Sequence, residues 1–427
     1  MPTKLVLLEQ LRLGMYVARL DVSWIRSPFL RHSFLIRKQA QIDRLRRAGV
    51  QAVEIDPHRG LDVDDLPGQI HQEAGGGPAV GQAATPLAAL APHTRLARLA
   101  EEYAHAKIAR QQLEQAVQSV YSSIAEQGTI DSRLAEEAVQ EIRIAARTVS
   151  NSALFMALSQ YRSGDAQLSR HALATCTLAL ILGQSYGFDP RQLNELGTAA
   201  LLHDVGLMEI APPILARCAS TSFLLTERER RQFQSHPRLT VRILERDAGF
   251  EASMLHLINE HHALLDGTGY PPETRGEFTS ARTRMLVIAD RYDEMIIGFG
   301  GATPLAPHQA LQRLYREAQE GRLDRDIVSR LIKSVGIYPV HSCVKLNTRE
   351  VAVVADLNPA RLHRPVVIIT HEPDGSSCPT PRMVDLAHQE GTDRERRIDS
   401  VLDLDACSVE PAHVTDQATP PLGLAYS

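Results

Sequence analysis

The sequence is poor in the features that mark membrane, secreted and nucleic-acid-binding proteins. Its longest apolar run, 174–183, contains two threonines and is too short to span a bilayer. The N-terminus reaches Glu9 after too few apolar residues for a signal peptide. The net charge of −5 argues against a general nucleic-acid binder, because phosphate contacts need a basic surface. These absences predict a cytoplasmic protein without a membrane span.

Cysteine and aromatic residues are also scarce. Aromatic residues make up 5% of the chain, so the cores must be built from Leu, Ile, Val and Ala, within a hydrophobic fraction of 44%. The cysteines are scattered, odd in number and without any Cys-x-x-Cys, which fits a reducing compartment and no thiolate zinc site: Cys176, Cys218, Cys343, Cys378 and Cys407. At about 150 residues per domain, the length suggests about three domains.

The first 65 residues predict a small α/β domain. Two strands are expected at 13–20 and 33–36, a helix at 39–48 that ends before a glycine, and a further strand at 50–55. Residues 66–94 are expected to form a flexible linker, because 74–94 contains seven Ala, four Gly and three Pro and no pattern that buries a face.

Two amphipathic helices are expected over 95–150. Apolar residues recur from Leu96 to Ile124 at alternating spacings of three and four, with Arg110 interrupting the stripe, and a second helix begins near Ser132. Two readings are open: the helices pack on the main domain, or they form a homodimer or signal-transmitting pair through 96–149.

The remainder of the chain divides into a helical and a β-rich part. Residues 165–335, within an expected domain of 151–340, are predicted to be mostly helical, and Thr226 with Glu229 forms the capping box of one helix. Residues 341–410 predict a small β-rich extension with strands at 344–346, 351–355 and 366–370, and 411–427 a loose tail. The fold class is therefore mainly α, with a small α/β domain before and a β-rich extension after the helices.

Histidine and aspartate gather in the helical part. His203 and Asp204 are neighbours, and adjacent side chains straddle a metal only at a helix kink. His261 and His262 precede a glycine turn that leads to Tyr270. Taken singly, each of these features is more often structural than functional.

Three further residues complete the set. His171 and His236 are isolated histidines, and Asp290 follows an apolar run, where a buried carboxylate needs a partner. Five imidazoles and two carboxylates exceed one tetrahedral zinc site, and they suit iron, manganese or zinc in a dinuclear centre. Two metals about 3.5–4 Å apart can clamp the attacking and leaving oxygens of a phosphoester.

In order and spacing these motifs resemble the HD-GYP domain, a branch of the HD phosphohydrolases. Five segments within 165–339 match the family's motifs in order. They are the segment 171–183, which starts at His171, then His203-Asp204-Val-Gly206, His236-Pro237, His261-His-Ala-Leu-Leu-Asp-Gly-Thr-Gly-Tyr-Pro271 and Ile288-Ala-Asp-Arg-Tyr-Asp293. Residues 12–63 are similar to the uncharacterised domain that often precedes this module. The resemblance implies an all-helical HD-domain bundle over 151–340.

The resemblance also implies an activity, hydrolysis of cyclic di-GMP to the linear dinucleotide or to GMP by a hydroxide bound to two metals. Iron or manganese is expected first, with zinc, nickel and magnesium as alternatives. His203 and Asp204 are expected to be catalytic, with Asp204 bridging the metals, and Asp293 and Tyr270 to contact substrate. The loop after the histidine pair is expected to contact diguanylate cyclase domains. The implied metal ligands are His171, His203, Asp204, His236, His261, His262 and Asp290.

The chain departs from the family pattern on the substrate side. Leu207 replaces a lysine that many members have, Ala263 replaces a glutamate, and Gln167 replaces the glutamate of members with three metals. The segment 296–303, where members carry Arg and Lys, has no basic residue, which leaves Arg284 and Arg291 as nearby substitutes.

These departures leave three readings open. The first is a metal-dependent cyclic di-GMP phosphodiesterase with slow turnover. The second is a catalytically weak sensor or scaffold that binds nucleotide or a diguanylate cyclase. The third is a phosphodiesterase whose substrate is another cyclic or linear nucleotide.

Overall fold

The structure is a computed structural model that describes residues 4–20, 34–36, 39–47, 52–57, 59, 92–148, 167–218, 225–246, 249–274, 276–299, 303–389 and 395–402. The chain forms two compact units, 1–86 and 87–427, and each is described here by itself. The finer domain boundaries stay predictions. Most of the expected linker 66–94 and all of the tail 411–427 lie outside the described residues.

The N-terminal unit is a small α/β fold. An antiparallel sheet in the order β1-β4-β2-β3 accompanies one helix: β1 (Lys4–Leu7), η1 (Leu8–Gln10), β2 (Tyr16–Leu20), β3 (Phe34–Leu35), α1 (Gln39–Arg47) and β4 (Ala52–Ile55). Val17, Leu45 and Ile55 are among its completely buried core residues. The predicted elements are confirmed except that β1 was missed, because its apolar residues run on without alternation and pairing with β4 defines the strand.

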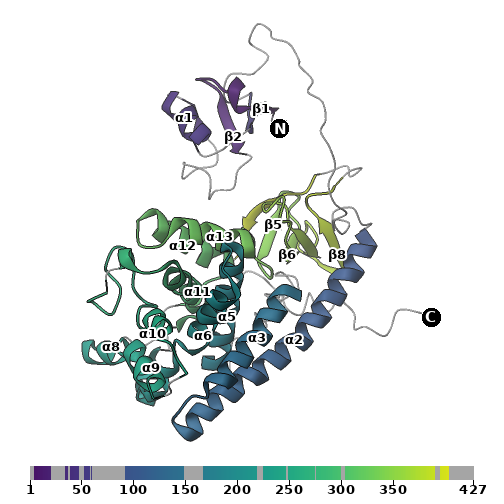
Figure 1. The fold of residues 1–427 in the computed structure, drawn as a ribbon. Coiled ribbons are helices and arrows are strands. Elements are labelled where there is room, and N and C mark those ends of the chain that lie inside the picture. The colour runs from purple at the N-terminus through teal and green to yellow at the C-terminus, as the bar shows by residue number, and fades with distance from the viewer. Residues whose placement is uncertain are drawn as a thin grey trace, which may run out of the picture. The chain divides into compact units, whose positions relative to one another are not determined.

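Two long helices lie side by side at the start of the second unit, α2 (Pro92–Gln127) and α3 (Ser132–Thr148) (Figure 1). The described part of the apolar stripe on α2, from Tyr103 to Ile124, is buried, and α2 packs against α3 and α5 within the chain. This packing is what the first reading of the stripe expected. The homodimer through 96–149 stays a prediction.

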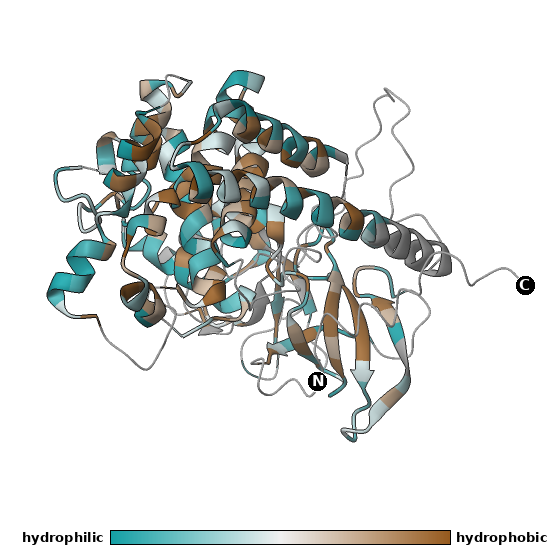
Figure 2. Cartoon of the chain, turned by 90° about the horizontal axis from the view of Figure 1, so that it is seen from below, coloured by the Kyte–Doolittle hydropathy of each residue, from teal (hydrophilic) through white to brown (hydrophobic). Residues whose placement is uncertain are grey.

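The helical bundle is built around α5, which packs against α2, α3, α6, α11 and α13. Its helices are α5 (Gln167–Tyr186), α6 (Pro190–Leu202), η4 (Val205–Glu209), α7 (Pro212–Cys218), α8 (Glu227–Phe233), α9 (His236–Leu244), α10 (Ala252–Asn259), η5 (Gly276–Phe278), α11 (Ala281–Ile297), α12 (Pro307–Gln319) and α13 (Arg325–Val335). The predicted capping box between Thr226 and Glu229 opens α8. Apolar residues gather where these helices meet (Figure 2).

The β-rich extension is one antiparallel sheet in the order β8-β7-β6-β5-β9. Its strands are β5 (Cys343–Leu346), β6 (Val351–Asp356), β7 (Val366–His371), β8 (Ser377–Asp385) and β9 (Ile398–Val401). Strand β7, between β8 and β6, is buried on both faces, and α2 contacts β8. The last two strands were not predicted, because neither contains a run of β-branched residues and β9 pairs with β5, a segment far from it in the chain.

Two findings bear on the expected location. Among the described residues, no helix is both long enough and apolar enough to cross a bilayer. Cys343 is disulfide-bonded, whereas Cys176, Cys218 and Cys378 are free. The sequence did not indicate a disulfide at Cys343, because spacing along the chain cannot show which cysteines approach one another in space.

Candidate metal centre

Five segments of the bundle bring the seven predicted ligands into one cluster. Histidine and aspartate side chains converge from α5, the α6–η4 junction, the start of α9, the residues after α10, and α11: His171, His203, Asp204, His236, His261, His262 and Asp290. His262 keeps 12% of its side chain exposed, and the other six residues are at most 4% exposed. The sequence prediction of which residues meet is thus matched by the geometry; their roles as ligands are taken up as a proposal below.

A break in the helix lets His203 and Asp204 reach the same cluster. α6 ends at Leu202, His203 is its C-cap, and Asp204 has non-helical backbone angles of φ −104° and ψ 6° before η4 begins. Because the chain turns at this point, the two adjacent side chains lie on one side, with His203 Nε2 3.5 Å from Asp204 Oδ2. This is the kink that the His-Asp pair required.

The first group of donor atoms forms around His171. Its Nε2 lies 3.2 Å from His203 Nε2, 3.1 Å from Asp290 Oδ1 and 3.7 Å from Asp204 Oδ2. Two nitrogen ligands of one ion, each bound at about 2.0–2.1 Å, are separated by about 3–3.5 Å when they subtend roughly 90–110°. The spacing of this group fits one divalent ion.

The second group uses the other oxygen of Asp204. Oδ1 lies 3.0 Å from His236 Nε2 and 3.6 Å from His261 Nε2. His236 Nε2 in turn lies 3.1 Å from His261 Nε2 and 3.2 Å from His262 Nε2. Asp204 therefore faces one group with each carboxylate oxygen, the arrangement of a bridging ligand.

Backbone carbonyls fix which ring nitrogen faces the centre. The Nδ1 atoms of His203, His236 and His261 each lie 2.6–2.8 Å from the carbonyl oxygen three residues earlier. Nδ1 then carries the proton in the neutral ring, so Nε2 presents a lone pair. Lone pairs of His236 and His261 that face each other at 3.1 Å repel unless a cation lies between them, and Asp204 Oδ1 is buried without a hydrogen bond. The residues fit a pair of divalent metal ions.

The charges of the cluster agree with this fit. Burial alone would raise the pKa of Asp204, but His203 and His236 hold it well below its usual range. The pKa of Asp290 is likewise lowered against burial, by His171 and His203. Burial lowers the pKa of His262 well below its usual value. Ionised carboxylates and a neutral His262 are the protonation states that metal binding requires. At His203 burial lowers the pKa but Asp204 and Asp290 raise it above its usual value, so this ring must release a proton to a metal ion.

Asp293 contacts the cluster through His171. Its Oδ2 is 2.7 Å from His171 Nδ1, and its side chain is 14% exposed. Burial lowers the pKa of His171, but Asp290 and Asp293 together raise it well above its usual value. Asp293 is thus placed to orient His171, and the substrate contact expected for it stays a prediction. The signal in the sequence was the three-residue spacing from Asp290, which places both carboxylates on one face of α11.

Tyr270 lies against His262 on the open side. The two rings stack with centroids 4.3 Å apart at 29°, and Tyr270 is half-buried. Burial and the neighbouring Glu294 raise the pKa of Tyr270 well above its usual value, so it is neutral. The close turn depends on Gly269, where a Cβ atom would lie 2.1 Å from the His262 carbonyl oxygen.

One wall of the site is apolar where the family pattern is basic. Leu207 is 1% exposed and belongs to a cluster with Ile210, Ile214, Cys218 and Phe233, against which Leu168, Leu215, Leu225, Leu239 and Phe299 pack. Phe299 stacks over His171 at 6.3 Å and 21°. The Leu207 side chain therefore points into this apolar cluster.

Arg284 and Arg291, the two arginines that could substitute for the missing basic residues, already form ion pairs. Arg291 donates to both carboxylate oxygens of Glu317 at 2.5 and 2.8 Å. Arg284 donates to Asp324 at 3.1 Å and to the Glu277 carbonyl at 2.9 Å. Neither is therefore poised to hold a phosphate.

Sequence reasoning missed Glu294. It lies one helical turn after Asp290 on α11, and His262, Asp290 and Glu294 each offer a donor atom within 4.8 Å of the others. The four-residue spacing was visible in the sequence, but nothing in the family pattern drew attention to it.

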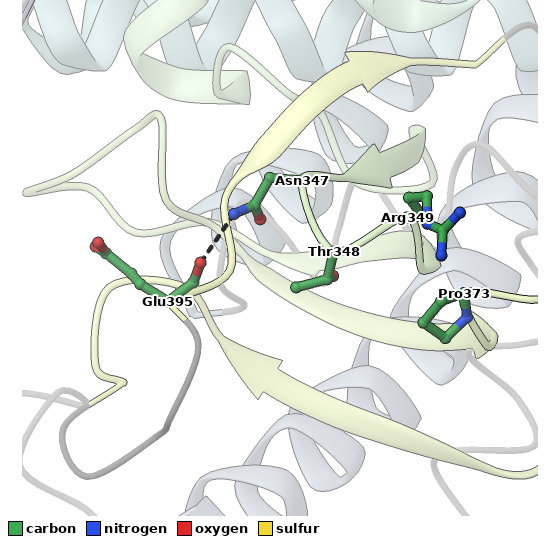
Figure 3. A pocket seen from close by; sticks show the side chains of 5 residues that line it. All are labelled: Asn347, Thr348, Arg349, Pro373 and Glu395. Atoms are coloured by element: carbon green, nitrogen blue, oxygen red, sulfur yellow. Dashed lines mark hydrogen bonds between the residues drawn. The ribbon is translucent and has the colours of Figure 1, made fainter. Parts of the chain in front are cut away.

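A separate pocket of about 470 Å³ lies on the β-rich extension. Figure 3 shows its lining, in which the Asn347 amide donates to the Glu395 carbonyl at 3.0 Å: Asn347, Thr348, Arg349, Pro373 and Glu395. None of these residues belongs to the metal cluster.

Comparisons with known proteins cover nearly the whole chain. Residues 3–135 match a domain of unknown function, DUF3391, and residues 131–327 match the HD domain. The cyclic di-GMP phosphodiesterase PA4108 of Pseudomonas aeruginosa is 31% identical, over 92% of this chain and 91% of that protein. The cyclic di-GMP phosphodiesterase PdeB of Borreliella burgdorferi is 24% identical over 46% of this chain and 50% of that protein. The 3'3'-cGAMP-specific phosphodiesterase 3 of Vibrio cholerae is 36% identical over 23% and 21%.

The residues matched to the HD domain include all seven members of the cluster. The near full-length match to PA4108 includes the N-terminal unit as well as the bundle. The chain therefore belongs to the HD-GYP family of cyclic di-GMP phosphodiesterases.

Proposed function

We propose that this protein hydrolyses the phosphodiester bonds of cyclic di-GMP at the seven-residue cluster, with two divalent metal ions. The observation that carries the proposal is Asp204, whose two oxygens face two separate groups of imidazoles. The curated relatives supply the substrate, since PA4108 and PdeB are named as cyclic di-GMP phosphodiesterases.

The proposed ligands divide between the two groups. His171, His203 and Asp290 would hold one ion and His236, His261 and His262 the other, with Asp204 shared. Metal ions bound there supply Lewis acidity and lower the pKa of water, which allows hydrolysis at neutral pH. The carbonyl contacts at Nδ1 hold three of the imidazoles in the productive tautomer, and Asp293 does so for His171.

Iron and manganese fit the donor set better than a soft metal, because two carboxylates accompany the imidazoles and no thiolate is present in the cluster. Zinc, nickel and magnesium remain alternatives, and elemental analysis of the purified protein identifies which metal is bound. A diguanylate cyclase partner and a cytoplasmic location stay predictions.

Turnover is expected to be slow. A positioned general acid contributes about 10²–10⁴-fold, and Leu207 is buried away from any such role. Tyr270, neutral and stacked on His262, carries a hydroxyl beside the cluster that we propose donates to a substrate oxygen.

The test is turnover of cyclic di-GMP by protein purified without oxygen and loaded with Fe²⁺ or Mn²⁺. Linear dinucleotide and GMP are followed by chromatography. We expect slow product formation that stops when a chelator removes the metal and returns when metal is restored. Turnover that continues in protein shown to be metal-free contradicts the proposal.

A second candidate, a nucleotide-binding sensor or scaffold with little activity, is favoured by the burial of Leu207 and the commitment of Arg284 and Arg291 to ion pairs. It predicts cyclic di-GMP binding to metal-loaded protein without product. Including 3'3'-cGAMP in the same assay tests the alternative nucleotide.

A further inference from the structure

The short segment that joins α6 to η4 carries two of the proposed ligands, and side-chain hydroxyl groups hold it at both ends. At its far end, Thr240 Oγ1 on α9 accepts from the Gly206 N–H and lies 2.9 Å from the His203 carbonyl oxygen. At its near end, the Tyr121 hydroxyl on α2 donates to the Leu201 carbonyl oxygen at 2.9 Å. Two helices outside the segment therefore fix where it begins and where it ends.

The Leu201 carbonyl lies where a helix needs a partner from outside. α6 ends at Leu202, and the last four carbonyls of a helix have no amide partner further along the same helix. The preceding carbonyl, that of Ala200, is taken by His203 Nδ1 at 2.8 Å, the contact that fixes the tautomer of this ring. The Leu201 carbonyl is taken by Tyr121, because a phenol keeps its proton at neutral pH and can donate it. Tyr121 thus completes the helix end from which His203 projects.

The helices α2 and α3 follow α6 along its length. Their contacts with it run from its first residue to its last turn: Arg143 with the Pro190 carbonyl, Gln140 with Asn194, Val139 with Gly197, and Tyr121 with Leu201. The approach at Gly197 is close, since a Cβ atom there would lie 2.6 Å from Val139 Cγ1. Of these four contacts, the Tyr121 hydrogen bond is the nearest in the chain to the proposed ligands. Tyr121 is 7% exposed and acts through the protein rather than on a substrate.

We propose that Tyr121 is a positioning residue of the metal centre, whose hydrogen bond to Leu201 holds the end of α6 where Asp204 can face both ions. The inference rests on the proposed function, in which the two ions share Asp204. Asp204 follows Leu201 by three residues, so a movement of the Leu201 carbonyl is passed on through planar, nearly rigid peptide units. Loss of the Tyr121 hydroxyl leaves a buried carbonyl short of a donor, which favours a shift of the helix end.

The test compares Tyr121→Phe, which removes only the hydroxyl, with Tyr103→Phe, the same change at a buried position on the same helix. Tyr103 is 2% exposed and packs with Val340, so it serves as the matched control. The number and affinity of bound Mn²⁺ ions are measured by titrating metal-free protein and following free Mn²⁺ with electron paramagnetic resonance. Denaturant unfolding of the metal-free proteins gives their stabilities, and turnover of cyclic di-GMP by the loaded proteins gives kcat and KM.

We expect Tyr121→Phe to bind Mn²⁺ about 2–10-fold more weakly than the wild type, the equivalent of one net hydrogen bond, and Tyr103→Phe to keep the wild-type affinity. In Tyr121→Phe kcat should fall while KM stays unchanged, because the buried hydroxyl does not touch the substrate. If wild-type protein binds two ions and Tyr121→Phe is less stable but binds them as tightly, this inference alone is overturned and Tyr121 is a structural contact. Equal losses of affinity in both variants overturn it as well. A wild-type protein that binds fewer than two ions overturns the two-ion proposal and, with it, this inference.

Discussion

The two sides of the site have diverged to different degrees from the family pattern. On the metal side, every expected imidazole and carboxylate is present, buried and oriented, as His203 and Asp204 illustrate. On the substrate side, Leu207 lies in an apolar cluster and Phe299 covers His171. The difference indicates that the two sets of residues can change independently. Contacts within the bundle hold the ligands in place, whereas the residues on the substrate side can be substituted without loss of these contacts.

Asp204→Asn is expected to give the largest effect, on the metal side. The amide cannot bridge with two charged oxygens, and loss of several kcal/mol of charge stabilisation corresponds to a fall in turnover of on the order of 10³-fold or more. Metal analysis should show the loss of bound ions while circular dichroism shows a folded bundle. Normal turnover with metal bound would contradict the shared role of Asp204.

Leu207→Lys is expected to come second, and its effect is on stability. Restoring the lysine of the family pattern places an ammonium in an apolar cluster, which we expect to lower the free energy of unfolding by about 2–4 kcal/mol relative to Leu207→Met. Denaturant unfolding measures the difference. If the variant is as stable as Leu207→Met and turnover rises, the lysine reaches the substrate and the wall is less fixed than the structure indicates.

Asp293→Asn is expected to weaken metal binding by about 10–100-fold, because the carboxylate that orients His171 is lost while the ligand itself remains. A titration with Mn²⁺ gives the affinity. Asp326→Asn, on an exposed face of α13, serves as the control. A change in KM for cyclic di-GMP with unaltered metal affinity would return Asp293 to the substrate contact expected from sequence.

Phe299→Ala is expected to have the smallest effect. The ring stacks on His171 and contacts Phe233, and such aromatic contacts contribute about 0.5–1.5 kcal/mol beyond burial. We expect a change of a few-fold in turnover at unchanged metal content. A loss of bound metal would show that the apolar wall and the ligand side are coupled rather than separable.

What the sequence could predict is what depends on neighbours in the chain. The capping box at Thr226 and the helical character of the region that carries the ligands follow from local spacing. The break at His203-Asp204 was a condition for a shared metal and was not itself predicted. The contact of Asp293 with His171 joins residues 122 positions apart. The spacing from Asp290 places Asp293 on the same face of α11, but no local pattern indicates which residue it contacts. The inward direction of Leu207 depends in the same way on α7 and α8, which complete the cluster around it.

Gly206 has a consequence for how the centre keeps its dimensions. The glycine lies where η4 meets α9, its N–H donates to Thr240 Oγ1 at 2.9 Å, and that hydroxyl lies 2.9 Å from the carbonyl oxygens of both His203 and His236. A Cβ atom at Gly206 would sit 2.3 Å from the His236 carbonyl oxygen. The clearance between the segment that carries Asp204 and the helix that carries His236 is thus less than one methyl group. The absence of a side chain at Gly206 thus sets the distance between the segment that carries Asp204 and the helix that carries His236. Any larger residue would increase the distance between Asp204 and His236.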